Sequence, residues 1–228
     1  MKVAPQADDG HERLREAIIQ GRLLPSQRLV EAELSKTFGL SRATVRLALL
    51  RLEQEGLVER QRHRGATVRV IGHEEAVEIM EARTALEALV AAKAAARASE
   101  REVSELRGIV GEMRQSLEEG NLLAASDNNP VLHRKILEIA ASRTLEQLLA
   151  TLNSQIVRYQ YRTILVPGRP EHSLAEHAEI VDAIGCGDPD RAAGAMREHL
   201  THVVGALSRV AQLSPQHAMR NGAGEGSI

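Results

Sequence analysis

The N-terminal third of the chain carries apolar residues at helical spacing in three short runs. Each run is closed by a glycine, the residue that most readily adopts the left-handed conformation after a helix. The runs and their closing glycines are Leu14, Ala17 and Ile18 before Gly21; Glu31 to Phe38 before Gly39; and Val45, Ala48, Leu49 and Leu52 before Gly56. This pattern predicts three helices.

The third of these helices has a clearly specified start. Ser41 is a good N-cap, and Leu40 stands at the spacing that packs onto Val45 in the first turn. Two short extended segments follow, at residues 57–60 and 66–70, and residues 61–65 join them. The order of helix, helix, turn, helix and two-stranded hairpin predicts a winged helix-turn-helix domain over residues 1–72.

From Glu74 onward only helical spacing is found, which predicts an all-helical second domain over residues 73–213. Ser173 with Glu176 reads as a capping box for the fifth of its helices, and Asp188 before Pro189 reads as the start of the sixth. The six predicted helices span residues 74–98, 100–118, 130–141, 144–165, 174–185 and 189–213. Residues 214–228 have no apolar period, and we expect a disordered tail there.

The fold class is therefore mainly α, with an N-terminal winged helix-turn-helix, a small β-hairpin wing and a C-terminal all-α helical bundle. Composition agrees, because 43% of residues are hydrophobic but only 1% are aromatic, so Leu, Ile, Val and Ala must build the core. Cys186 is the only cysteine, which excludes an intrachain disulfide and a cysteine-based zinc cluster. No apolar run approaches a membrane span or a secretory signal, and we expect a cytoplasmic protein.

Charge is distributed unevenly along the chain. Residues 1–72 hold 13 Lys and Arg against 9 Asp and Glu, a net of +4, whereas residues 73–228 hold 16 against 22, a net of −6. A basic front segment suits phosphate contacts, although an ordinary mixed surface gives a similar count. Charge alone therefore decides nothing.

The third helix and the hairpin tip carry the side chains that suit DNA. Arg42 and Arg46 lie one turn apart near Ser41 and Thr44, and such groups can meet a guanine edge or a phosphate. Arg62, His63 and Arg64 crowd the tip, where Gly65 permits the turn. Either arginine alone reads better as a solubilising surface residue, but the combination with a basic wing favours DNA binding.

These features make the sequence similar to the GntR family of bacterial transcription regulators. The resemblance covers residues 11–70 and rests on Gly21-Arg-Leu-Leu-Pro-Ser-Gln-Arg-Leu-Val-Glu-Ala-Glu-Leu and Gly39-Leu-Ser-Arg-Ala-Thr-Val-Arg-Leu-Ala-Leu-Leu-Arg-Leu. It implies operator contacts from Ser41, Arg42, Thr44, Arg46, Arg64 and Gly65. Ala43 occupies a commonly polar position, so we expect the bases read there to differ from those of most members.

Three segments of the second domain each place a histidine on a predicted helix: Val131-Leu-His-Arg-Lys-Ile, Ser173-Leu-Ala-Glu-His-Ala-Glu-Ile-Val-Asp-Ala-Ile and Ala195-Met-Arg-Glu-His-Leu. With these segments, residues from about 74 to 210 resemble the effector-binding FCD-type domain of the FadR branch, in its shorter VanR-like form. The resemblance implies a divalent metal on His133, His177 and His199, with a small carboxylate effector held by the metal. A lone histidine on a helix is more often an ordinary surface or core residue, so the site depends on this wider pattern.

The fourth metal ligand is the open question of this site. The family's Asp position is Asn129, whose amide oxygen is a weaker ligand, and Pro130 biases Asn129 away from helical geometry. His202 is an alternative to His199, and Asp127 replaces Asn129 if the helix is offset. Three imidazoles suit zinc or nickel.

Arg83 matches a position where the branch often places a polar side chain facing the effector cavity, and Arg162 is a weaker candidate. An interhelix ion pair with a glutamate explains Arg83 equally well. The leading hypothesis is a homodimeric repressor whose affinity for a palindromic operator changes when a metabolite binds. A regulator with a structural metal or none is the alternative, and a metalloenzyme ranks low, because Glu176 beside His177 reads as a helix cap and the DNA-reading half would have no role.

Overall fold

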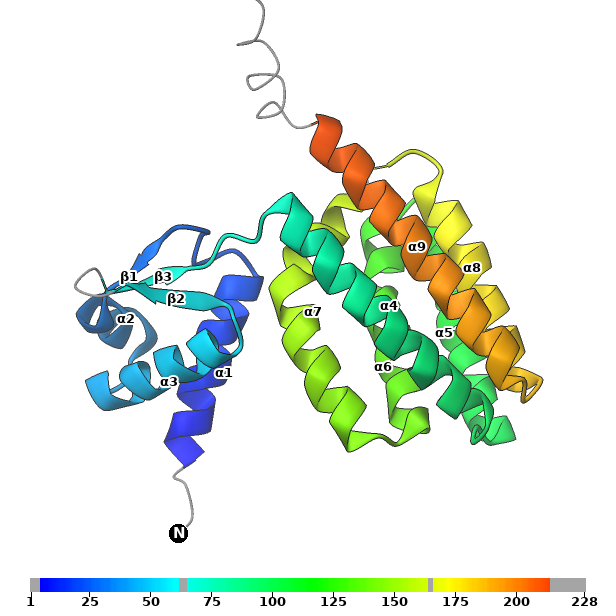
Figure 1. The fold of residues 1–228 in the computed structure, drawn as a ribbon, viewed down its shortest axis with the longest axis horizontal. Coiled ribbons are helices and arrows are strands. Elements are labelled where there is room, and N and C mark those ends of the chain that lie inside the picture. The colour runs from blue at the N-terminus through cyan, green and yellow to red at the C-terminus, as the bar shows by residue number, and fades with distance from the viewer. Residues whose placement is uncertain (1–4, 62–64, 164–165, 214–228) are drawn as a thin grey trace, which may run out of the picture. The chain divides into compact units, whose positions relative to one another are not determined.

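The computed structural model describes the backbone of residues 5–61, 65–163 and 166–213, and the side chains of residues 9–60, 65–156 and 166–209 (Figure 1). Packing divides the chain into two compact units. The first holds the residues up to Gly72 together with Ala150–Arg158, and the second holds His73–Leu149 and the residues from Tyr159 onward. The predicted tail at residues 214–228 lies outside the described residues, as does the predicted wing tip at residues 62–64.

The first unit is a helix-turn-helix with a small antiparallel sheet. Its elements are α1 (Pro5–Ile19), β1 (Arg28–Leu29), α2 (Glu31–Phe38), α3 (Arg42–Gln54), β2 (Val58–Gln61) and β3 (Gly65–Val68). The three apolar stripes seen in the sequence meet in one core, in which Leu14, Leu49 and Leu52 are almost fully buried. The periodicity of the sequence therefore identified the packed faces of α1 and α3.

The sheet differs from the predicted two-stranded hairpin. β3 lies between β2 and β1 in the order β1-β3-β2, with Arg28 opposite Thr67 and Leu29 opposite Ala66. β1 has only two residues, too short for an alternating pattern to be read from the sequence. Leu29 is 4% exposed, so this short strand closes the core beneath the sheet.

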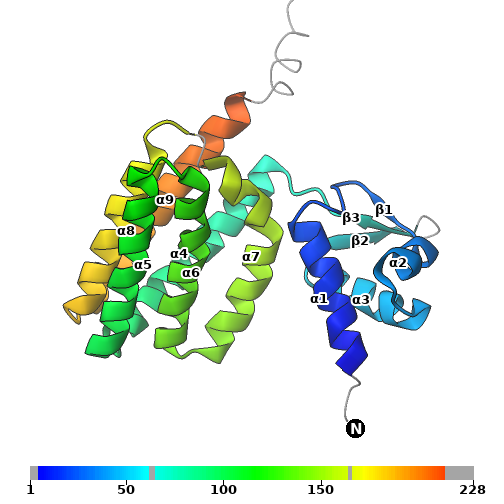
Figure 2. The ribbon, with the colours of Figure 1, turned by 180° about the vertical axis from the view of Figure 1, so that it is seen from behind.

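The second unit is a bundle of helices within the described part of the chain. Its helices are α4 (His73–Ala95), α5 (Glu100–Glu118), α6 (Leu122–Ala140), α7 (Arg143–Thr163), α8 (Arg169–Gly185) and α9 (Pro189–Leu213), the middle of α7 being grouped with the first unit. Figures 1 and 2 show α4 running alongside α9, and α4 also packs against α6 and α8. None of the helices described has both the length and the apolar character needed to cross a membrane.

Two helices of this bundle start more than one residue earlier than predicted. α6 starts at Leu122, where Asn121 accepts a hydrogen bond from the backbone N–H of Ala124, and Pro130 lies inside the helix. The expected bias of Asn129 away from helical geometry is therefore not realised, because the helix continues through Pro130. Pro130 cannot donate the backbone hydrogen bond of an interior helical residue, and its ring crowds the carbonyl one turn earlier, so the rest of α6 must offset this cost.

The predicted capping box of Ser173 and Glu176 is also wrong. α8 starts at Arg169 after Gly168, which adopts a left-handed conformation with φ +75°, so Ser173 lies inside the helix. The carboxylate of Glu176 is thereby free to turn toward other helices. The start of α9 agrees with the prediction, since Asp188 Oδ1 accepts from the backbone N–H of Arg191 at 3.0 Å.

Candidate DNA-reading helix and candidate metal centre

The start of α3 is held by local hydrogen bonds. Ser41 is the N-cap, and its Oγ accepts from the backbone N–H of Thr44 at 3.1 Å and lies 2.8 Å from Thr44 Oγ1. α1 packs closely here, because a Cβ atom at Gly10 would lie 2.5 Å from the Thr44 side-chain methyl. The predicted cap is therefore present, and it fixes where the exposed face of α3 begins.

Arg42 and Arg46 are both exposed on α3, and Arg46 is paired with a carboxylate. Arg46 Nε and Nη2 donate to the two oxygens of Glu31, at the start of α2, at 3.2 and 2.9 Å. This hydrogen-bonded pair lowers the pKa of Glu31 and raises that of Arg46. Because the pair is exposed, its charges remain available to exchange with a phosphate or a base edge.

The wing is described only at its base. Gly65 has φ +86° and pairs with Gln61 in the register of β2 and β3, so a left-handed residue does stand where the sequence placed the turn. The predicted contact Arg64, with Arg62 and His63, lies outside the described residues.

His133 on α6, His177 on α8 and His199 on α9 come together in the second unit. One nitrogen of each lies within 4.8 Å of the others, and the ring centroids are 4.4 to 5.6 Å apart. His177 and His199 are each 2% exposed. Among the described His, Cys, Asp and Glu residues, only these three converge in this way. The three histidines named from the sequence thus come from three helices to one buried point.

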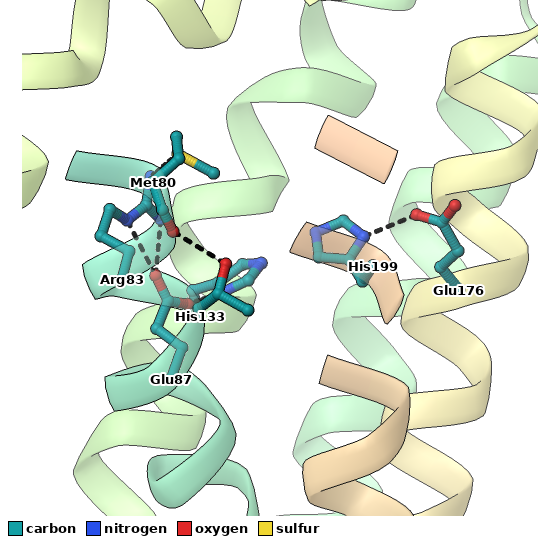
Figure 3. A network of polar contacts seen from close by, with 7 residues as sticks. Met80, Arg83, Glu87, His133, Glu176 and His199 are labelled. Carbon is teal, nitrogen blue, oxygen red and sulfur yellow. Dashed lines mark hydrogen bonds and ion pairs between the residues drawn. The ribbon is translucent and has the colours of Figure 1, made fainter. Parts of the chain in front are cut away.

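Two of the three imidazoles are oriented by a carboxylate on the far side of the ring. His133 Nδ1 lies 2.5 Å from Glu87 Oε2, and His199 Nδ1 lies 2.6 Å from Glu176 Oε2. Figure 3 shows both rings lying between these two carboxylates. A carboxylate on Nδ1 fixes the tautomer in which Nε2 carries the free lone pair, as in metal-binding histidines. The Nε2 atom of His177 is buried and has no hydrogen-bond partner among the described residues.

Each orienting carboxylate is itself held by a buried arginine. Arg83 Nε and Nη2 donate to Glu87 Oε1 at 3.0 and 2.6 Å, and Arg83 is 4% exposed. Arg169 Nη2 donates to Glu176 Oε2 at 2.8 Å, and Arg169 is 6% exposed. A buried carboxylate needs such a partner, because an unpaired charge in the interior is costly.

The titration of the site follows from burial and from these contacts. Burial lowers the pKa of His177 well below its usual value, and neighbouring positive charges, among them Arg169, add to this effect. Burial also lowers the pKa of His199 to about 4, although the hydrogen bond to Glu176 opposes the shift. Both imidazoles are therefore neutral near pH 7, the form that binds a metal.

Burial raises the pKa of the two carboxylates, Glu87 and Glu176, but the charged partners of each carboxylate lower its pKa by more. Arg83 and His133 hold the pKa of Glu87 far below its usual range in spite of burial. Contacts with His199, Arg169 and His202 likewise bring the pKa of Glu176 to about 2. Both carboxylates are thus charged at any physiological pH.

The remaining predicted residues lie around this cluster with different roles. Asn129 is half-buried on α6, one turn before His133 and on the same face, whereas Asp127 is exposed and does not join the cluster. His202 is 52% exposed and contacts Glu176 Oε1 through Nδ1 at 2.7 Å. The interhelix ion pair considered for Arg83 is instead a pair within α4. The side chain of Arg162 lies outside the described residues.

Sequence reasoning missed Glu87, Glu176 and Arg169. The spacing of Arg83 and Glu87 on one helix face is a usable signal, since residues four apart on a helix are neighbours. For Glu176 the signal is incomplete, because Arg169 lies two turns before it on α8 but its partners His199 and His202 belong to α9 and approach it only in the folded bundle.

A winged helix-turn-helix with a separate helical unit is the architecture of a DNA-binding regulator, and comparison with known proteins agrees. The bacterial regulatory protein gntR family model matches residues 9–68, and the FCD domain model matches residues 78–202. The chain belongs to the GntR family and carries an FCD domain. Members of this family are transcriptional regulators that bind operator DNA and are not enzymes.

Curated relatives cover most of the chain. The chain is 30% identical over 187 residues to a probable D-xylose utilization operon transcriptional repressor of Paenarthrobacter nicotinovorans, covering 80% of each chain. It is 26% identical over 199 residues to the HTH-type transcriptional repressor RspR of Escherichia coli, covering 87% of each. Among solved structures, E. coli McbR/YncC matches with a TM-score of 0.76 at 20% identity, covering 91% of this chain and 99% of that one. At that identity the match supports the fold alone.

Proposed function

We propose that this protein is a transcription repressor whose operator affinity is set by a small carboxylate effector bound at a divalent metal. The observation that carries the proposal is the convergence of His133, His177 and His199 on one buried point. DNA contacts are assigned to Ser41, Arg42, Thr44 and Arg46 on α3, with Arg64 and Gly65 on the wing. Repression is assigned by analogy with the relatives, which are named repressors.

The residues present fit a metal. Three imidazoles are a common donor set for zinc and nickel, and they leave coordination positions for other ligands. The carboxylates on His133 and His199 supply the orienting contacts that such ligands usually have. The unpartnered Nε2 of His177 is a buried polar atom that an ion would satisfy. Asn129 is the candidate for a fourth, neutral ligand.

The charge of the donor set favours an anionic effector. The three imidazoles and Asn129 bring no negative charge, while Glu87 and Glu176 are already paired with Arg83 and Arg169. A divalent ion here would therefore carry nearly all of its positive charge uncompensated in a buried place, which is unfavourable. A carboxylate that enters the open coordination position would supply the missing charge.

Control of DNA binding requires that effector and operator act on different sites of one molecule. We infer a homodimer in which two α3 helices read the halves of a palindromic operator, as in other helix-turn-helix proteins. Effector binding in the helical unit would then change how the two reading helices are presented. The bundle supplies the sensing site, and the first unit supplies the DNA contacts.

The proposal is tested by metal content and DNA binding measured on the same samples. Elemental analysis of the purified full chain should give about one zinc or nickel ion per chain, and His177→Gln should remove it. His172→Gln is the matched control, because His172 lies on the same helix but is exposed. Operator binding that responds to small carboxylates only in the metal-loaded protein supports sensing. A wild-type chain that binds neither metal refutes the proposal, and a metal that never affects the response indicates a structural role.

A further inference from the structure

Arg169, the first residue of α8, has one end of its guanidinium group without a partner. The residue is 6% exposed, and its Nη2 donates to Glu176 Oε2 at 2.8 Å. Its Nη1 is buried and has no hydrogen-bond partner among the described residues. A buried charged donor without an acceptor is costly, so such an atom needs an explanation.

The other buried arginine of the bundle shows that the fold can satisfy such a group. Arg83 places Nε and Nη2 on Glu87, and its Nη1 contacts the Met80 sulfur at 3.4 Å (Figure 3). All three of its nitrogens thus have neighbours within its own helix. The unpartnered Nη1 of Arg169 is therefore a particular feature of this residue and is not common to the buried arginines described here.

Arg169 lies directly beside the histidine cluster. Glu176 Oε2 accepts from Arg169 Nη2 and lies 2.6 Å from His199 Nδ1, so a single oxygen links the guanidinium group to a candidate metal ligand. The positive charge of Arg169 is also close enough to contribute to the lowered pKa of both His177 and His199. The guanidinium group of Arg169 is thus separated from the histidine cluster by one carboxylate oxygen, and it carries one unpartnered donor, Nη1.

We propose that Arg169 Nη1 is the protein's second contact to the effector and donates to a carboxylate oxygen of a molecule bound at the metal. This inference rests on the proposed function and adds to it an effector-binding residue in place of Arg83, which is occupied by Glu87. Arginine suits a carboxylate because its planar donors match the planar acceptor. Recognition then uses two points, the metal and Arg169, and favours ligands whose oxygens span both.

A purely structural role is the competing explanation. In that case Arg169 only holds Glu176, and through it His199, and replacing Arg169 would change metal binding but not ligand selection. The two roles differ in what they predict for the metal-loaded protein, and they are separated by measuring zinc content and carboxylate affinity independently.

The test uses the full chain loaded with zinc and a thermal-shift titration with acetate, succinate, citrate and inorganic phosphate. At least one of the three carboxylates should raise the Tm of the wild-type protein. Arg169→Gln should keep the zinc but weaken the affinity for that carboxylate at least about tenfold, the loss of one charge-assisted hydrogen bond. Arg169→Lys should weaken it less. Arg191→Gln, an exposed arginine paired with Glu179, is the control and should leave the affinity unchanged.

The outcomes separate the two proposals. A wild-type chain that does not bind zinc removes the metal centre itself. Zinc binding with the same carboxylate affinity in wild type and Arg169→Gln overturns only the role of Arg169. Zinc binding with no response to any of the three carboxylates, or with phosphate preferred over all of them, also overturns it. If Arg169→Gln does not fold, Arg169→Lys carries the comparison, and an unchanged affinity in that variant counts against the proposal.

Discussion

Two arginine–glutamate pairs in this protein use the same chemistry in opposite surroundings. Arg46 and Glu31 lie on the surface of the first unit, where the arginine side chain is 62% exposed and the glutamate 36%. Arg83 and Glu87 lie inside the helical bundle, where the side chains are 4% and 5% exposed. Both pairs use Nε and Nη2 of the arginine, so the pairs differ mainly in their access to water.

The difference in exposure decides whether the arginine of each pair can leave its glutamate for another partner. Water and salt weaken the exposed pair, so DNA can replace Glu31 as the partner of Arg46 at little cost. The buried pair cannot separate without leaving an ion in the interior, so it keeps Glu87 in place against His133. The surface pair therefore suits reversible recognition, and the buried pair suits a preorganised ligand site.

The largest expected effect is the loss of the buried carboxylate. Glu87→Leu should destabilise the metal-free protein by about 3–5 kcal/mol, because Arg83 is left buried without its counter-ion. Urea unfolding followed by circular dichroism measures the change. Glu179→Leu is the matched control, since Glu179 pairs with Arg191 through the same two arginine nitrogens on the surface. If both variants lose the same stability, burial is not what distinguishes the two kinds of pair.

The buried histidines should make stability depend on pH. The pKa of His199 falls from 6.5 to about 4 on folding, and that of His177 falls well below 6.5. Below pH 6.5 the unfolded chain therefore takes up protons that the folded chain refuses, and stability falls as the pH drops toward 4. Between pH 6.5 and 4.5 the loss from His199 alone should be about 2 kcal/mol, and His177 should add to it in the same direction.

Between pH 6.5 and 4.5, the change in stability should come from the buried histidines and not from Glu176. Because the pKa of Glu176 is lowered to about 2, its contribution is complete above pH 4.5 and is lost only in more acidic solution. Urea midpoints of zinc-free protein across the window measure the slope, and His199→Gln should make it shallower. His172→Gln is the control, because His172 is exposed and its replacement should leave the slope unchanged. An identical slope in wild type and His199→Gln would contradict a neutral buried His199.

Replacing the exposed Arg46 should change the affinity for DNA and not the stability of the fold. Arg46→Ala should weaken binding to an operator selected in vitro by on the order of tenfold, while leaving unfolding nearly unchanged. Fluorescence anisotropy at fixed salt, with the selected operator and with a scrambled duplex, measures affinity and selectivity. Arg191→Ala removes an exposed arginine of the helical unit and should have no effect. Unchanged affinity and selectivity in Arg46→Ala would refute the assignment of α3 as the reading helix.

The sequence predicted those parts of the molecule that depend on neighbouring residues. The cap at Ser41, the start of α9 at Pro189 and the buried faces of α1 and α3 all follow from residues within one or two turns. The starts of α6 and α8 were misplaced, because Pro130 was read as a helix boundary and Ser173 as a cap. Both residues are tolerated inside helices when tertiary packing stabilises the longer segment.

The candidate site also has a part that the sequence predicted and a part that it did not. His133, His177 and His199 could be named from their resemblance to a known pattern, but their orienting partners could not. Arg169 and Glu176 are two turns apart on α8 itself, but Glu176 meets His199 only after α8 and α9 pack together. Such contacts depend on helix rotation and separation, which the apolar period of a single helix does not specify.

The last and weakest effect is expected from a change at Glu31, the acidic partner in the exposed pair. Glu31→Gln removes a negative charge beside the DNA-reading face and should raise the affinity for any duplex by about two- to fivefold. It also releases the Nε–Nη2 edge of Arg46, which Glu31 holds in one orientation in the free protein. A less ordered guanidinium group reads a base edge less strictly, so the ratio of operator to scrambled-duplex affinity should fall.

Glu33→Gln is the matched control, because it removes the same charge from the same helix. If Glu33→Gln lowers the ratio equally, Glu31 acts only as a charge. If the ratio falls in Glu31→Gln alone, the exposed pair positions Arg46 for base reading much as the buried pair positions His133, and the two regions differ in reversibility alone.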